Sequence, residues 1–167
     1  MRVMFSRKLF ILVFCLLGCS MLSEMQAKKD AESLVYSIQC GGSGTQGYYI
    51  VEVTAYANKT SQINQDLVCR CAVHGVLFKG FSGSNGCTSQ RPLAGSPMIE
   101  QQHQEFFEPF FQEGGGYSSY ASMVGGSLKT QKEGKRYKVT ATISVAKEQL
   151  RKDLEKAGVI KGLNSGF

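Results

Sequence analysis

The stretch VCRCAVHG places Cys69, Cys71 and His74 within six residues, and these side-chain types act as nucleophiles, redox groups or metal ligands. On a helix Cys71 and His74 share a face, whereas Cys69 and Cys71, two residues apart, diverge. A tetrahedral zinc site needs four converging ligands, and Cys40 and Cys87 would have to join from glycine-rich loops. We therefore expect no metal and no cofactor.

A thiol-dependent hydrolase or redox protein that uses Cys71 with His74 is the alternative that these residues leave open. A reactive thiolate needs an exposed, electropositive setting, but Ile63, Leu67 and Cys71 recur every fourth residue and predict a buried helix face. We expect His74 to be protonated near the C-terminal end of that helix. With no G-x-S-x-G motif and no interpretable carboxylate pair, no catalytic residue is predicted and the protein is not expected to be an enzyme.

The elements that position these residues follow from hydrophobic periodicity. Alternation over 49–55 predicts a strand, and a helix is expected from Ser61 to His74 with Gly75 as its stop. VLFKGF (76–81) predicts a second strand, and the crossover between the two strands would be right-handed if they pair in parallel. Gly42 to Gly47 match the dinucleotide fingerprint, but they lead into a strand rather than a helix, so no nucleotide site is expected.

The second half of the chain predicts a helix, a hairpin and a final helix. Ser96 and Pro97 open a helix that should kink or restart near Glu108, because Pro109 removes a hydrogen bond. Residues 137–145 alternate strictly and should pair with the segment before them. Leu150 and Leu154 mark the last helix, which Gly158 ends. The predicted fold is α+β, two layers, with helices on one face of one mixed sheet in the order β-α-β-α-β-β-α.

The same layout predicts no intramolecular disulfide. Cys40 precedes the first expected strand and Cys87 follows the second. If those strands are parallel neighbours, the two loops lie at opposite ends of the sheet, beyond the roughly 7 Å that α-carbons of a disulfide require.

Residues 1–18 have the features of a secretory signal, with Arg2, Arg7 and Lys8 ahead of an apolar run. Leu16-Leu17-Gly18-Cys19 resembles a lipobox, which predicts cleavage before Cys19 and its lipidation. The alternative is a signal over 1–27, cleaved after Ala27 to leave a soluble periplasmic chain. Residues 19–33 are then a tether, and 34–167 a single α+β domain.

The net charge is +6, and the three cations in residues 1–18 account for half of it, so no polyanionic partner is required. Residues 129–161 carry ten Lys or Arg against four acidic residues. Exposed aromatics are not interleaved with these cations, so we expect a solvated face and no nucleic acid partner.

AVHGVLFKGF (72–81) and YKVTATISVAKEQLRKDLEKAGVIKGLNSGF (137–167) resemble small envelope proteins of Bacteroidetes. More remotely, the order of elements resembles the α+β domains of accessory lipoproteins of the flagellar assembly protein T type and the curli-secretion lipoprotein type. The resemblance implies a non-enzymatic interaction or assembly module at the periplasm or outer membrane, held there through Cys19 if lipidated. Its partner would be an unidentified envelope protein, and the resemblance supplies no catalytic residues.

Overall fold

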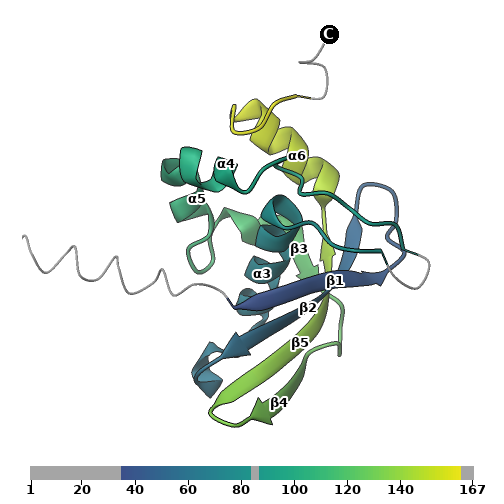
Figure 1. The fold of residues 1–167 in the computed structure, drawn as a ribbon, viewed down its shortest axis with the longest axis vertical. Helices are drawn as coiled ribbons and strands as arrows, with labels where there is room; N and C mark the ends of the chain where they lie inside the picture. The colour runs from purple at the N-terminus through teal and green to yellow at the C-terminus, as the bar shows by residue number, and fades with distance from the viewer. Residues whose placement is uncertain (1–34, 84–86, 163–167) are drawn as a thin grey trace, which may run out of the picture. The chain divides into compact units, whose positions relative to one another are not determined.

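The computed structural model describes residues 35–83 and 87–162, so the expected signal, tether and lipidated Cys19 lie outside the described residues. Its framework is one antiparallel sheet (Figure 1). The strands are β1 (Tyr36–Gly42), β2 (Tyr49–Ala57), β3 (Ala121–Met123), β4 (Lys129–Glu133) and β5 (Arg136–Val145). Their order across the sheet is β1-β2-β5-β3, and β4 pairs with β5 farther along the strand.

The helical segments are the 3-10 turns η1 (Thr60–Gln62) and η2 (Gly116–Tyr120) and the helices α3 (Gln65–Phe78), α4 (Met98–Gln102), α5 (Gln104–Phe110) and α6 (Lys147–Lys156). In Figure 1, α3 lies behind the sheet, with α4 and α5 beside it. No helix within 35–83 or 87–162 is long and apolar enough to cross a membrane.

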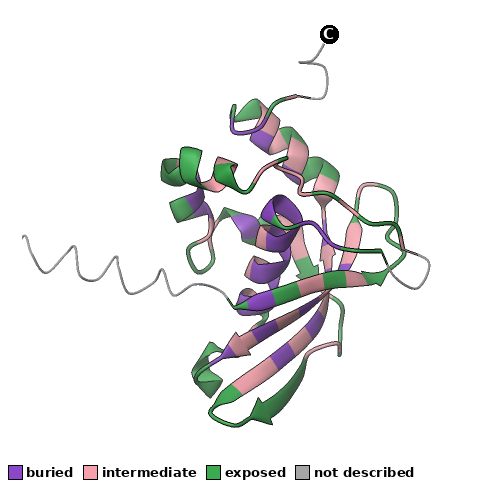
Figure 2. Cartoon of the chain, viewed as in Figure 1, coloured by how far each residue is buried: buried purple, intermediate pink, exposed green. Residues whose placement is uncertain are grey.

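The core lies between α3 and one face of the sheet. Val51 on β2 pairs with Ile143 on β5, and both are fully buried. On the opposite face Thr54 pairs with Thr140, and both side chains are partly exposed. Figure 2 shows this alternation of buried and intermediate residues along β2 and β5. A strand with one dry face produces this pattern of period two.

The α+β class is confirmed, but two details of the predicted fold are wrong. Every strand pair among the described residues is antiparallel, so the sheet is not mixed. The order of strands and α-helices is β-β-α-α-α-β-β-β-α. It differs from the prediction because β1 was expected to be a loop and VLFKGF a strand, because the helix expected after Ser96 is divided into α4 and α5, and because the segment before β5 forms two strands, β3 and β4. Residues 76–78 instead form the last turn of α3, and Phe81 makes a single antiparallel bridge with Gln90.

Helix α3 begins and ends later than expected. Asn64 caps its N-terminus, with its side-chain oxygen accepting a hydrogen bond from the Leu67 N–H at 2.8 Å. Gly75 lies inside the helix instead of ending it. A Cβ at Gly75 would stand 2.8 Å from the Ile38 side chain, so the missing side chain allows β1 to pack closely on the helix.

The helix expected to begin near Pro97 is divided before Glu108, the position near which Pro109 predicted a kink or restart. It breaks at His103, between α4 and α5, whereas Pro109 lies in the last turn of α5. The hairpin of β4 with β5 and the final helix α6 are confirmed. Gly158 follows α6 with a φ of 71°, as expected for a glycine that ends a helix.

Candidate functional site

The two cysteines of the opening motif are core residues of α3. Cys71 is 0% exposed and Cys69 is 4% exposed. Burial raises the pKa of the Cys71 thiol to about 12 and that of Cys69 to about 11, which keeps both thiols protonated near neutral pH. Within the parts of the chain that the structure describes, no three His, Cys, Asp or Glu side chains gather in a way that could hold a metal ion.

His74 belongs to a chain of polar side chains that the sequence did not reveal. The Tyr36 hydroxyl lies 2.6 Å from Nδ1 of His74, and Nε2 of His74 lies 2.9 Å from Oε1 of Glu100. With a neutral imidazole, the Tyr36 hydroxyl donates to Nδ1 and the Nε2–H donates to Glu100. These bonds join β1, α3 and α4 through one side chain.

His74 does not lie at the end of its helix, so the reason for expecting it to be protonated is wrong. Helix α3 continues to Phe78, and the His74 ring packs against the rings of Tyr36, Phe78 and Phe111. Burial in this aromatic setting lowers the pKa of His74, although the Glu100 carboxylate opposes the shift. Burial likewise raises the pKa of Tyr36, so its hydroxyl stays neutral and available as a donor.

Lys79, directly after α3, lies against the same tyrosine. Its Nζ stands 3.6 Å from the centre of the Tyr36 ring and donates to the Tyr36 carbonyl oxygen at 3.2 Å. Burial lowers the pKa of Lys79, while the residue as a whole remains exposed. Gly80 then turns the chain with a φ of 66°, where a Cβ would stand 2.3 Å from the Gln90 carbonyl oxygen.

Cys40 and Cys87 form a disulfide, with α-carbons 6.3 Å apart, which overturns the prediction of no bond. That prediction placed the two cysteines at opposite ends of a parallel strand pair. Instead Cys40 lies on β1 itself, and the chain after α3 (residues 79–83 and 87–92, called the excursion below) lies beside β1 (Figure 1). The bond ties this excursion, bridged at Phe81 and Gln90, to the far end of β1.

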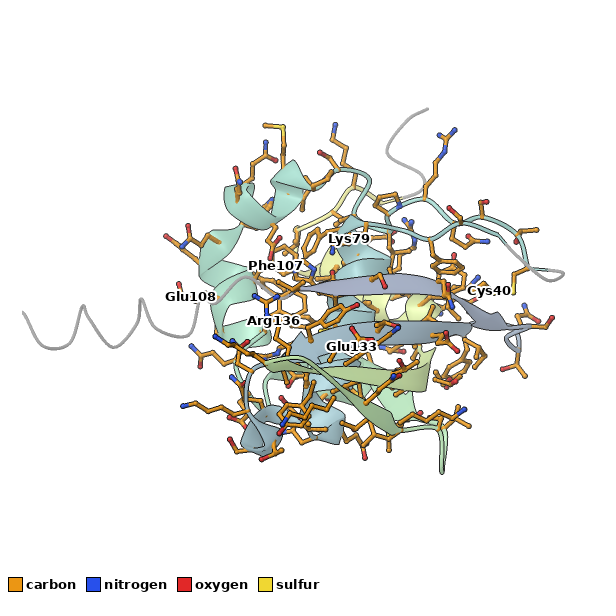
Figure 3. All side chains as sticks on the ribbon, turned by 60° about the horizontal axis from the view of Figure 1, so that its bottom comes forward. Cys40, Lys79, Phe107, Glu108, Glu133 and Arg136 are labelled. Atoms are coloured by element: carbon orange, nitrogen blue, oxygen red, sulfur yellow. A yellow bond between two sulfur atoms is a disulfide. The ribbon has the colours of Figure 1, made fainter. Side chains whose placement is uncertain are left out.

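An open groove of about 530 Å³ lies between β1 and this excursion. Its lining residues are Tyr36, Ser37, Ile38, Lys79, Gly80, Phe81, Ser82, Gln90, Arg91 and Pro92. Figure 3 shows Lys79 and Cys40 near opposite ends of β1. The wall that β1 contributes spans three residues, about 10 Å of strand at roughly 3.3 Å per residue.

The wall formed by β1 is a strand edge with backbone groups directed outward. The Tyr56 N–H donates to the Val35 carbonyl oxygen at 3.1 Å, so these two opposite residues form a hydrogen-bonded pair at the start of the β1–β2 ladder. Hydrogen-bonded and non-hydrogen-bonded pairs alternate along an antiparallel ladder. Ser37 and Gln39 therefore bond to β2 through their backbone, whereas the N–H and C=O groups of Tyr36 and Ile38 point away from β2. Within the described residues no strand pairs with this outer edge.

Sequence reasoning had named Cys71 with His74, and the structure places His74 with Tyr36 and Glu100 instead. Tyr36 is 38 residues from His74, and Glu100 is 26 residues away, so no local spacing marks the group. The groove had one local signal, the alternation of Tyr36, Ile38 and Cys40 before the glycines. Comparisons with known proteins found no matching family model, no matching curated protein and no matching solved structure.

Proposed function

We propose that this protein is a non-enzymatic interaction module of the cell envelope that binds an extended peptide segment of another envelope protein along β1. The observation that carries the proposal is the outer edge of β1, where the backbone groups of Tyr36 and Ile38 face the groove. A peptide that adds as a strand gains main-chain hydrogen bonds from such an edge and side-chain contacts from the surrounding pocket.

The geometry of the groove suits a peptide. The segments 79–82 and 90–92 line the groove opposite β1, and the disulfide joins Cys87, between these segments in sequence, to Cys40 on β1. Among the described residues that line it, Lys79 and Arg91 are charged and none carries a carboxylate, which fits a segment with negative charge. β4 of a second copy, with Lys129 and Lys132, has the wrong charge for this groove.

The disulfide and the N-terminal sequence support the envelope location in this proposal. The Cys40–Cys87 disulfide fits an oxidising compartment such as the periplasm. The apolar run before Cys19 and the resemblance to Bacteroidetes envelope proteins add to it. We propose an outer membrane lipoprotein that faces the periplasm or the surface, anchored by Cys19, with a soluble periplasmic form as the alternative.

The alternative activity, a thiol-dependent hydrolase or redox protein, has less support. Its nucleophile would be Cys71, which is completely buried and has a pKa raised to about 12 by that burial. A reactive thiol needs access and a lowered pKa. The described side chains therefore favour binding over thiol chemistry at this part of the fold.

Backbone N-methylation of a probe peptide tests strand addition without changing the protein. The probe is a nine-residue peptide of alternating Thr and Val with a central Asp, and binding is followed by fluorescence anisotropy. Two derivatives are methylated on alternate residues in opposite phases. In an added strand, the N–H groups of alternate residues point toward β1. We therefore expect methylation of those N–H groups to abolish binding, and methylation of the N–H groups in between to preserve it. Equal binding by both derivatives, or no binding of the parent probe, would overturn the proposal.

Amide hydrogen exchange in the same complex gives an internal control within β1. The Ile38 amide faces the groove and should become protected when the peptide binds. The Gln39 amide already faces β2 and should be unchanged. Protection that spares Ile38 would place the peptide, a second copy or a small ligand elsewhere on the protein and contradict the assignment.

A further inference from the structure

We propose that the groove selects extended peptides that carry an acidic side chain, because Lys79 occupies the β1 edge in the free protein and a carboxylate draws it away. This inference deepens the proposed function and rests on it. It assigns Lys79 and Arg91 two different roles in recognition.

Lys79 occupies one of the acceptors that an added strand would use. Its ammonium donates to the carbonyl oxygen of Tyr36, one of the outward-facing groups of β1, at 3.2 Å. It also lies 3.6 Å from the centre of the Tyr36 ring, so the ring and the carbonyl hold the cation together. A lysine at an exposed strand edge is a common way in which proteins discourage unwanted strand pairing.

Displacement of Lys79 has a different cost for neutral and for acidic peptides. A neutral peptide that bonds to the Tyr36 carbonyl breaks a charge-assisted hydrogen bond and leaves the ammonium without an anionic partner. A peptide with a carboxylate supplies that partner while its own N–H takes over the carbonyl. Burial already lowers the pKa of Lys79, which agrees with an ammonium that is partly shielded from water in its present place.

Arg91 provides a second cation that is free to bind. Its side chain is exposed, and no ion pair or hydrogen bond ties it to another described residue. A guanidinium can bind a carboxylate through two parallel hydrogen bonds. Because Arg91 makes no hydrogen bond to the described residues of β1, whereas Lys79 does, its charge should strengthen binding of acidic peptides without affecting access of neutral ones.

The test compares two peptides on three variants. The peptides are the nine-residue probe with a central Asp and the same peptide with Asn at that position. Wild-type protein should prefer the Asp peptide by roughly tenfold in Kd, the ratio that about 1.4 kcal/mol produces. Lys79→Met should bind the Asn peptide more tightly and reduce the preference to about threefold or less. Far-UV circular dichroism checks that each variant is folded.

Arg91→Gln and Lys152→Met separate the roles of individual cations. Arg91→Gln should weaken the Asp peptide and leave the Asn peptide unchanged, because the Tyr36 carbonyl is still covered. Lys152→Met removes an exposed cation of α6 outside the groove lining and should leave both affinities unchanged. An equal loss for both peptides in Lys79→Met, or an unchanged ratio, would overturn the role of Lys79.

Failure of this inference is distinguishable from failure of the proposed function. If both peptides bind the wild-type protein equally and protect the Ile38 amide, strand addition stands and acidic selection is wrong. If neither peptide binds the wild-type protein, both proposals are wrong.

Discussion

Removing the Cys40–Cys87 disulfide should cost a large part of the stability of the fold. The bond joins residues 47 apart in sequence. For a closed loop of that length, the chain-entropy relation gives about 13 to 14 cal/mol/K of lost unfolded-state entropy, or about 4 kcal/mol at 25 °C. We expect Cys40→Ser to lower the free energy of unfolding by about 4 kcal/mol, and by less where the unfolded chain retains structure.

The measurement is urea unfolding followed by far-UV circular dichroism on three variants, Cys40→Ser, Cys87→Ser and the double substitution. Either single change breaks the same bond, so all three should lose nearly the same free energy. A loss of about 4 kcal/mol corresponds to a fall in Tm of about 15 °C for a domain of this size.

Three results would contradict this expectation. Losses below about 1 kcal/mol would show that the link does not restrict the unfolded chain as the loop length requires. Losses that add in the double variant would show that the two cysteines stabilise the protein separately. Native alkylation of both thiols, detected by mass spectrometry without reduction, would show directly that the bond is absent.

Three further predictions concern the core, the histidine and the buried thiol. Ile143 is fully buried, so Ile143→Asp should cost several kcal/mol at least, whereas Thr140→Asp, on the open face opposite Lys129, should change urea stability by less than about 1 kcal/mol; equal losses would mean that the faces of β5 are misassigned. Burial holds the pKa of His74 below its ordinary value of about 6.5, so the unfolded state binds more protons below that pH and stability should fall as pH drops through about 6.5. His74→Gln should make the stability profile between about pH 7 and 5 flatter, and an unchanged slope would contradict the shift. Cys71 should resist iodoacetamide in the folded protein while urea-unfolded protein reacts, because burial raises its pKa to about 12; rapid native labelling would favour the thiol-enzyme alternative.

The strands with one dry face were the easiest elements to predict. From Val51 in β2 and from Val139 in β5, buried and partly exposed positions alternate to the end of the strand, and the sequence shows the same alternation. The last helix was equally clear, because Leu150 and Leu154 lie on one face and Gly158 follows them. In each case burial on a single side leaves a period in the sequence that can be read directly.

The elements that were predicted wrongly lack such a period. Residues 76–78 are buried at every position, and a short apolar run of this kind fits a buried strand as well as a buried helix. A glycine such as Gly75 often ends a helix, but here its missing side chain allows close packing on Ile38. That contact comes from a distant segment, so the local sequence does not reveal it. β1 is short and ends in glycines, so its alternation covers few residues.

The candidate site was harder to predict than the fold because its parts meet only in three dimensions. The sequence singled out His74, but its partners Tyr36 and Glu100 come from separate elements. The groove depends on β1, where a loop was expected, and on the disulfide, which the parallel strand arrangement had excluded. Two wrong assignments, those of residues 36–42 and 76–81, therefore removed the site from the predicted structure.

The pairing of β2 with β5 constrains the order in which this protein can fold. Thr54 and Thr140 are cross-strand neighbours but lie 86 residues apart in the chain. The hairpin of β1 and β2 can form from local sequence, but one side of β2 has no partner until β5 has been synthesised. Contacts across such distances make folding slow. A chain that is still being synthesised therefore leaves one edge of β2 unpaired until residues 136–145 emerge, and an unpaired strand edge favours aggregation during that interval.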